Sequence, residues 1–473
     1  MKKNIHLLLV IFFIFVFFLY FSFLSIRRVE TLNSHYYDMG IMNQVVYNTA
    51  KGRFLEMTNA TFLKNMSRLA IHFDPILILF SPFYLISPSY KWLLVFQALI
   101  VALGSLAVFL LTSLLTSSKN MALFFSLIYL LNYQIGRAII FDFHPVVLAT
   151  TFLLWACYFY HKKKFNYYYL FLFLSLLTKE HVGLFIFFLG LFYLFNFKDK
   201  RNGLITIFLG LTFFLLTNFF LIPYFRQEEH FAFNYYKNIK NSINILEGER
   251  LSYLKRIYLP FFYSFLTPAV FLSLPELLIN LLSKNKNMIS YYFHYQSLIL
   301  AGLFYGLVLG YKNFNQIVKN NLIKKIVFGI FLISNMYYFY QFYPLPFLVK
   351  EKAIYRDINF LTKKAILIWQ KTLKDEKIKV ATTPKLAPFF SSRKFYANFL
   401  FDPAFYNLGY SDEEIFGLKK DSFKMVDYVV IYKKEIGDIT KENAIKKLYN
   451  NFLQNKSFQL VFDQAEIEVY KKN

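Results

Sequence analysis

Long apolar stretches, each followed by a short polar turn, fill the first 343 residues of the chain. A helix needs about 20 mainly apolar residues to cross a bilayer, and several stretches reach that length. The pattern predicts an α-helical polytopic membrane protein with about nine to eleven spans and additional interfacial helices. The clearest predicted spans are residues 5–26, 91–115, 121–135, 145–160, 165–178, 182–197, 203–224, 295–310 and 323–343.

The turns between these spans carry most of the positive charge. Residues 161–164 and 198–201 are strongly basic, and four lysines between the last two spans or at the start of the last one mark a third such turn, namely Lys312, Lys319, Lys324 and Lys325. Because short loops rich in Lys and Arg stay in the cytoplasm, these turns and the N-terminus are expected there. Residues 27–75 then form a loop on the extracytoplasmic side of the inner (cytoplasmic) membrane.

Three segments depart from the simple pattern. Residues 40–52 have the spacing of a short amphipathic helix at the membrane interface. Residues 76–86 are apolar but short and are flanked or interrupted by prolines, which favours a re-entrant or interfacial helix. Residues 257–290 contain three prolines and are expected to form a hairpin of two short helices that starts and ends outside; a different number of crossings is the alternative.

The composition changes after residue 343. Residues 377–382, 425–432 and 466–470 have the pattern of short strands, and residues 351–374 favour a helix. The chain thus divides into a membrane domain, residues 1–343, and a small extracytoplasmic α/β domain, residues 344–473, with strands buried between helices. The second domain lacks a glycine-rich phosphate loop, so no nucleotide site is expected.

Composition agrees with the membrane assignment. The 473 residues are 57% hydrophobic, the mean hydropathy is +0.39, and the net charge is +25. Cytoplasmic loops and anionic lipid headgroups explain this charge better than a nucleic-acid partner does. The single cysteine, Cys157, lies in a predicted span and cannot form an intrachain disulfide.

Ionisable residues collect at span ends on the predicted outer face. They are Asp38, His72, Asp74, Asp142, His144, Lys179, Glu180 and His181. Charges near a membrane are costly and often functional, so the set predicts one outward-facing cavity. Two chemistries fit it: a carboxylate base with cationic groups for a phosphate, or a divalent metal held by Asp, Glu and His. A simpler role also exists for Asp38, which could cap the helix at 40–52.

The order of these motifs resembles a large prokaryotic membrane-protein family known only as a domain of unknown function. The matching residues run from about 36 to 310. They are Asp38-x-Gly40-x-x-x-Gln44, Gly52-Arg53, His72-Phe73-Asp74-Pro75, Phe141-Asp142-Phe143-His144-Pro145, Lys179-Glu180-His181, Pro275-Glu276-Leu277 and His294-Tyr295. His181 stands where that family usually has an acidic residue.

That family is similar to the GT-C glycosyltransferases, and the resemblance implies an enzyme that takes a hexose or pentose from a polyprenyl-phosphate donor outside the membrane. Asp38 matches the position of the catalytic base. The residues expected to bind substrate are Gln44, Arg53, His72, Asp142, His144, Lys179, Glu180, His294 and Tyr295, with Arg137 as a further phosphate contact. Asp74, Asp142, His144 and Glu180 are the expected ligands of a divalent metal, Mg²⁺ or Mn²⁺.

Two other functions remain open at this stage. A transporter or flippase for a lipid-linked or small polar substrate would need polar residues near the middle of the membrane and usually shows internal repeats. The charges here collect at one face, which favours the enzyme. A scaffold for envelope assembly, acting through residues 350–473, is the third; retained transfer after deletion of those residues would argue against it.

Overall fold

The computed structural model describes residues 5–59, 63–236, 248–346, 348, 355–399, 411–437 and 444–473. Contacts divide the chain into two compact units. Unit 1 holds residues 1–25, 69–76 and 95–350, and unit 2 holds residues 26–68, 77–94 and 351–473. The C-terminal residues are thus grouped with most of the loop that follows the first span. The sequence had instead suggested one boundary, at residue 344.

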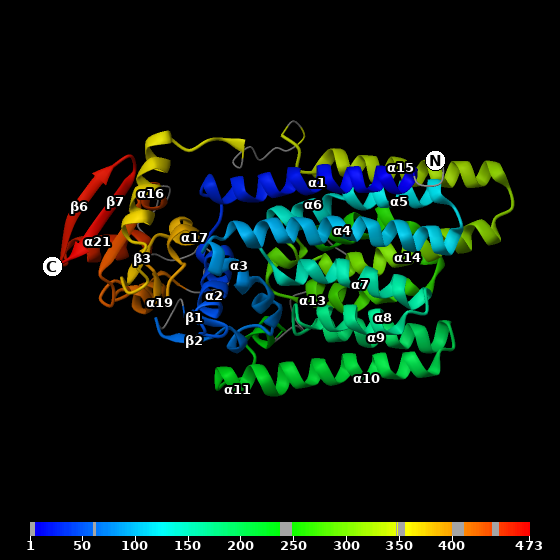
Figure 1. Ribbon diagram of the computed structural model, residues 1–473, viewed down its shortest axis with the longest axis horizontal. Helices are drawn as coiled ribbons and strands as arrows, with labels where there is room; N and C mark the ends of the chain where they lie inside the picture. Colours follow the sequence, from blue (N-terminus) through cyan, green and yellow to red (C-terminus); the bar gives the residue numbers. More distant parts are fainter. Residues whose placement is uncertain are drawn as a thin grey trace. The chain divides into compact units, whose positions relative to one another are not determined.

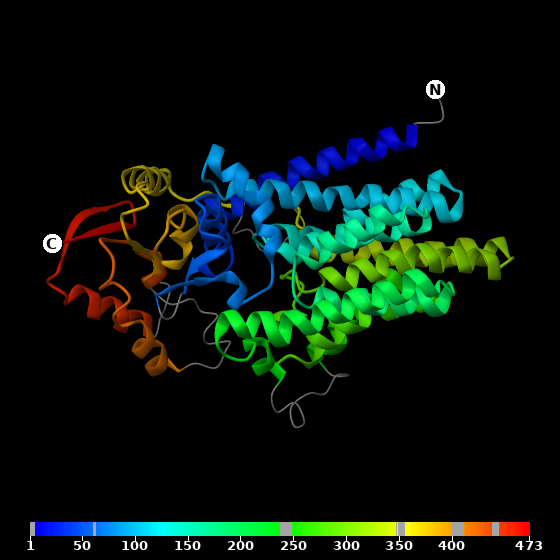
Figure 2. The ribbon, with the colours of Figure 1, turned by 60° about the horizontal axis from the view of Figure 1, so that its bottom comes forward.

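Unit 1 consists of long helices that run side by side (Figure 1; Figure 2). Two of them, α1 (Ile5–Glu30) and α4 (Lys91–Thr116), place only residues 5–25 and 95–116 in this unit. The others are α5 (Lys119–Leu131), α6 (Tyr133–Ile140), α7 (Pro145–His161), α8 (Phe165–Leu176), α9 (Val182–Asn196), α10 (Lys200–Leu216), α14 (Ser297–Ile317) and α15 (Asn321–Phe342).

Five helical segments among the described residues are long and apolar enough to span a membrane. They are Ile5–Glu30, Lys91–Thr116, Lys200–Arg226, Ser297–Ile317 and Asn321–Phe342. The segment Lys200–Arg226 joins α10 to η5 (Thr217–Leu221) and α11 (Ile222–Arg226). α5 and α6, bent by 43° at Asn132, would add a sixth span. α7, α8 and α9 are apolar but only 12–17 residues long, so the predicted total of nine to eleven spans stays a prediction.

Several helix ends lie where the sequence predicted them. α4 and α5 are separated only by Ser117 and Ser118, and the Ser118 hydroxyl accepts the backbone N–H of Met121. α7 starts at Pro145, which suits the first turn of a helix because no N–H is needed there. The basic residues 162–164 form the turn between α7 and α8. Proline, serine and charge patterns thus set these boundaries.

The proline-containing stretch, which was expected to form a hairpin of two short helices, instead forms a longer series of short helices. They are α12 (Gly248–Tyr258), η8 (Leu259–Leu266), η9 (Pro268–Ser273) and α13 (Leu274–Leu282). They pack against glycines spaced four residues apart on α14. A Cβ at Gly302 or Gly306 would make tight contacts of 3.0 Å with Leu272 or Ser264, and one at Gly310 would clash with the backbone of Tyr263, so glycine permits this close approach.

Unit 2 contains a five-stranded sheet in the order β4-β3-β5-β7-β6. The strands are β3 (Val380–Thr382), β4 (Tyr396–Asn398), β5 (Tyr428–Tyr432), β6 (Phe458–Gln464) and β7 (Ile467–Lys472). β3 is parallel to β4 and β5, while β7 is antiparallel to β5 and β6. The three predicted strands are confirmed, and β4 and β6 were missed.

Helices cover both faces of this sheet, which confirms the predicted α/β class. Side chains alternate along β5, so Val429 and Ile431 share a core with α19 (Asp412–Lys419) and α21 (Ala444–Leu453). α16 (Phe360–Thr372) and α17 (Ala387–Phe390) pack against β7 and β3. The predicted helix at 351–374 is α16, and residues 351–354 lie outside the described residues.

The segment after the first span also belongs to unit 2. It forms the π-helical turn η2 (Tyr36–Gly40), α2 (Ile41–Ala50) and a hairpin of β1 (Glu56–Thr58) and β2 (Asn65–Ser67). The prediction that residues 40–52 lie at the membrane interface is wrong, because every residue from Ile41 to Thr49 is buried. The Asn43 side chain donates to the Ser391 hydroxyl at 2.9 Å, which ties α2 to the C-terminal part of unit 2.

Candidate functional site

A buried carboxylate, Glu180, holds the centre of the polar site in unit 1. It lies in the turn between α8 and α9 and is 4% exposed. His72 Nδ1 lies 2.9 Å from Glu180 Oε1, and the backbone N–H of Phe73 donates to Oε2 at 3.1 Å. The N–H of Ile76 donates to the carbonyl of Leu177 at 3.0 Å, so the loop before η4 (Pro75–Phe80) is joined directly to the α8–α9 turn.

A second histidine faces the same carboxylate. His230 precedes η6 (Phe231–Tyr236) and is 2% exposed; its Nε2 lies 3.8 Å from Glu180 Oε1. Its other nitrogen, Nδ1, accepts the backbone N–H of Ala232 at 3.0 Å. Burial acts to raise the pKa of Glu180, but the neighbouring His72, then Lys179 and His181, bring this pKa well below its usual value. The imidazole of His72 and the ammonium of Lys179 thus favour the charged form of this buried carboxylate.

The next residue, His181, faces a second buried carboxylate. His181 Nε2 lies 3.2 Å from Oε2 of Glu276, which is 5% exposed on α13. Burial and the nearby Lys179 lower the pKa of His181 to about 3, against the opposing effect of Glu180. Asn280 lies one turn after Glu276 and donates to the Tyr253 hydroxyl and the Tyr295 carbonyl, at 2.9 and 2.8 Å.

Two further histidines stack on each other at the start of α7 and of α14. The rings of His144 and His294 are 3.7 Å apart at 21°. His144 Nδ1 lies 3.0 Å from the carbonyl of Phe141. The side-chain amide of Gln97, on α4, makes two hydrogen bonds to the backbone of this segment. Gln97 Oε1 accepts from His144 N, and its Nε2 donates to the Asp142 carbonyl, at 2.9 and 2.7 Å. Burial, then His144 and Lys179, lower the pKa of His294.

Asp38 lies in unit 2, within η2. The interpretation of Asp38 as a helix cap is wrong, because Gly40 occupies the N-cap position of α2. Burial, followed by Arg28 and Lys385, lowers the pKa of the neighbouring His35 to about 4, while Asp38 acts to raise it. The partly buried Asp38 carboxylate therefore shares its surroundings with two cations of the same unit.

Two predicted substrate residues of unit 2 make structural contacts. Gln44 is fully buried; its amide donates to the Thr58 hydroxyl at 2.9 Å and accepts the Thr58 N–H at 3.1 Å. Arg53 forms an ion pair of 2.8 Å with Glu376, which also accepts the Tyr47 hydroxyl at 3.0 Å. These bonds hold α2 and its flanking residues in place.

The structure thus brings together several of the predicted site residues. His72 contacts Glu180, Lys179 adjoins it, and His144 stacks on His294 beside Tyr295, whose ring lies 4.5 Å from that of His294. Sequence reasoning missed Gln97, His230 and Glu276 as site residues. An amide or a carboxylate inside an apolar stretch was the available signal for Gln97 and Glu276.

One group of side chains has the spacing of a metal site. Ligand atoms of His72, Glu180 and His230 all lie within 4.8 Å of one another. Of the four predicted metal ligands, only Glu180 belongs to this group; Asp74 and Asp142 are 2% and 1% exposed elsewhere in unit 1. The role of Asp74, Asp142 and His144 as ligands stays a prediction.

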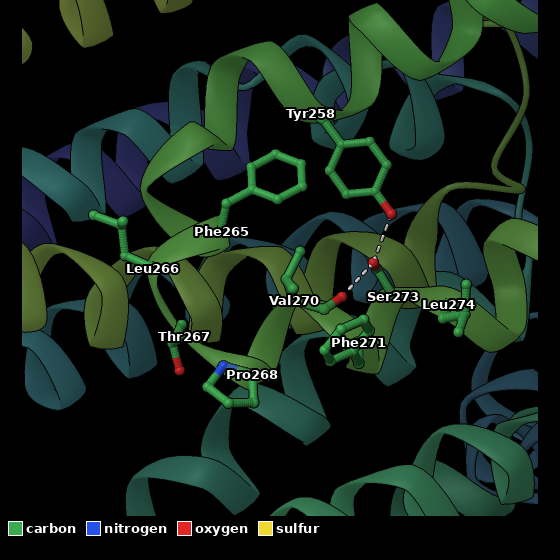
Figure 3. Close-up of a pocket in the computed structure, with 9 residues that line it drawn as sticks. All are labelled: Tyr258, Phe265, Leu266, Thr267, Pro268, Val270, Phe271, Ser273 and Leu274. Carbon is green, nitrogen blue, oxygen red and sulfur yellow. Dashed lines mark hydrogen bonds between the residues drawn. The ribbon is translucent and has the colours of Figure 1, made fainter.

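The helices of the proline-containing stretch also line an apolar cavity of about 540 Å³ (Figure 3). Its walls come from α12, η8, η9 and the start of α13. Figure 3 draws two hydrogen bonds there. The Tyr258 and Ser273 hydroxyls are 2.8 Å apart, and the Ser273 hydroxyl donates to the Val270 carbonyl. The lining contains no carboxylate, histidine, lysine or arginine, so the cavity offers mainly hydrocarbon surface.

Fold and site together define a polytopic helical membrane protein with an α/β unit and a buried His/Glu cluster at helix ends. The family model for DUF2079, described as predicted membrane proteins, matches residues 28–469. The chain therefore belongs to this family, which confirms the family predicted from its motifs.

A search of curated proteins finds no match. Among solved structures, the chain is similar to the apo oligosaccharyltransferase of Archaeoglobus fulgidus, with 12% identity and a TM-score of 0.48. The match covers 92% of this chain and 70% of that one. At this score the likeness carries no argument about activity.

Proposed function

We propose that the protein is a membrane glycosyltransferase that moves a sugar from a polyprenyl-phosphate donor to an acceptor hydroxyl on the extracytoplasmic face. The observation that carries the proposal is the buried cluster around Glu180, in which His72, Lys179 and His181 surround one carboxylate at helix ends of unit 1. Ionisable groups in a membrane protein are costly to bury and commonly mark a substrate site.

The position of the cluster favours an enzyme over a transporter. His72, Glu180, His230 and His294 lie in loops or turns, and His144 immediately precedes α7. Transporter sites are usually built near the midplane from broken helices. The order of motifs around these residues resembles that of the DUF2079 family, and the similarity of that family to GT-C enzymes supports the same choice.

The proposed reaction joins the acceptor oxygen to the anomeric carbon and breaks the bond from that carbon to the phosphate oxygen. Asp38 takes the hydroxyl proton as general base, and polyprenyl phosphate leaves with the electron pair. Lys179 is the proposed cation for the phosphate, with His144, His294 and Tyr295 lining the site. These roles rest on the family resemblance, together with the burial of His144 and His294.

The test compares a deletion strain with strains carrying chain variants. A wild-type copy should restore the envelope glycans and clear accumulated acceptor, and Asp38→Asn should fail to do so. Asp421→Asn, an exposed aspartate paired with Lys424, is the matched control and should restore the profile. An unchanged profile in the deletion strain would refute the enzyme, and full rescue by Asp38→Asn would refute the assignment of the base.

A second measurement separates transfer from transport. Purified protein in detergent has no membrane across which it could move a substrate, and a transporter does not change its substrate chemically. The proposed enzyme should still release polyprenyl phosphate from glycosylated lipid extract, detected by mass spectrometry. Lipid that stays fully glycosylated when acceptor extract is present would count against the proposal.

A further inference from the structure

The three side chains that share one point in unit 1 have a chemistry different from the rest of the site. His72 and His230 supply imidazole nitrogens and Glu180 supplies one carboxylate oxygen, from three segments more than 40 residues apart in the chain. Two histidines and one glutamate are a ligand set known from zinc enzymes. Mg²⁺ prefers oxygen ligands, which this set does not provide in number.

The distances agree with ligation of one ion. Ligands about 2.0–2.2 Å from a tetrahedral metal lie about 3.3–3.6 Å from each other. Here the separations from Glu180 Oε1 are 2.9 Å to His72 Nδ1 and 3.8 Å to His230 Nε2. All three ligand atoms lie within 4.8 Å of one another, so small movements of the two imidazoles would place both nitrogens and the oxygen around one ion.

An independent observation also indicates a ligand. His230 is 2% exposed, yet its Nε2 has no hydrogen-bond partner among the described residues, although it faces Glu180. Buried polar atoms nearly always have a partner, and an ion supplies one. The N–H of Phe73 holds the second oxygen of Glu180 and so orients the carboxylate, as outer contacts do around metal ligands.

We propose that His72, Glu180 and His230 bind one divalent transition-metal ion, of which Zn²⁺ fits the donors best. The inference concerns binding and does not depend on the proposed sugar transfer. The site differs from the ligand set expected from the sequence, since it omits Asp74, Asp142 and His144.

Ion binding has a structural cost at His230. Without metal, Nδ1 accepts the N–H of Ala232, which leaves the proton of the neutral ring on Nε2. Ligation through Nε2 moves this proton to Nδ1, so the contact with Ala232 is given up. The amide of Ala232 should then exchange its hydrogen faster in the metal-loaded protein.

The experiment measures metal content directly. The full chain, purified in detergent with a tag that contains no histidine, is stripped with chelator, loaded with Zn²⁺ and desalted. Mass spectrometry of the metal should find one equivalent per chain, and Co²⁺ in its place should give visible absorption bands. His230→Ala and His72→Ala should each lower zinc at least tenfold, while His6→Ala, a half-buried histidine of the same unit that contacts Asn120, should keep it.

Thermal melts confirm that each variant is folded before its metal is counted. Zinc that stays bound in His230→Ala, or wild-type protein that binds less than a tenth of an equivalent, would overturn the proposal. Failure of sugar transfer in a zinc-loaded protein would instead count against the proposed enzyme and leave the metal site standing, so the two can be told apart.

Discussion

Glu180 joins three segments of unit 1 through one buried carboxylate. It accepts from the Phe73 backbone and pairs with His72, and His230 faces the same oxygen. Removing one partner of a buried charged pair destabilises a protein more than removing an exposed pair does. The remaining charged or polar group stays buried but has lost its partner.

We expect Glu180→Ala to destabilise the protein by about 3–5 kcal/mol and Glu180→Gln by less, since glutamine keeps one acceptor. Thermal unfolding can be followed with a thiol-reactive dye, because Cys157 is the only cysteine and is buried. The exposed Glu229→Ala is the control and should melt like wild type. Equal melting of Glu180→Ala and wild type would contradict the central role of Glu180.

Residue types could be predicted from the sequence, but their partners could not. The Lys179-Glu180-His181 motif and His72-Phe73-Asp74 both indicate polar chemistry, and both lie in the cluster. His230 stands in a mixed-charge loop without a motif, 50 residues after Glu180, so only the fold brings it to that carboxylate. Gln44 and Arg53 also belong to motifs, but their polar groups bind neighbouring residues of unit 2 and hold the structure together.

At the level of helices, close packing between α9 and α10 depends on glycines. Each helix has two glycines seven residues apart, at 183 and 190 and at 203 and 210, and these face the partner helix. A Cβ built on Gly190 would lie 2.5 Å from the backbone nitrogen of Ile207. Small residues let helix backbones approach in a membrane, where hydrophobic burial alone gives little drive.

Gly190→Ala should therefore destabilise the protein by about 1–3 kcal/mol, the usual cost of overpacking. Gly329→Ala is the matched control, because α15 leaves open space at that position and alanine is the better helix former. The control should melt at or slightly above the wild-type temperature. The prediction fails if the two alanine variants shift the melting temperature alike.

Helix existence followed from apolar length, whereas helix type in the proline-containing stretch did not. Pro260, Pro268 and Pro275 predict breaks, and the structure has them. The sequence alone could not show that these pieces are largely 3₁₀-helical and pack on the glycines of α14. That outcome depends on a contact between segments about 40 residues apart.

At the scale of the membrane unit, basic turns mark one end of the helices. Residues 162–164, Lys198 and Lys319 follow α7, α9 and α14. The start of α5 lies beside the start of α1, where His6 contacts Asn120 at 2.6 Å. By the positive-inside rule, we propose that this end faces the cytoplasm.

Single cysteines in a Cys157→Ser background test this orientation. Lys163→Cys and Lys319→Cys should react with a membrane-impermeant thiol reagent only after cells are opened, and Glu229→Cys should react in intact cells. The background without added cysteine is the control and should stay unlabelled. Labelling of Lys163→Cys in intact cells would reverse the orientation and move the Glu180 cluster to the cytoplasmic face.

The membership of unit 2 has a consequence for how the chain is made. Residues 26–94 supply α2 and the β1–β2 hairpin, while Ser391, which binds Asn43, is synthesised about 350 residues later. At 5–20 residues per second the ribosome needs roughly 15–70 s to cover that distance. During that time α2 lacks its partners while membrane helices are inserted. Unit 2 therefore closes last, and a prematurely truncated chain exposes the buried face of α2 to quality control.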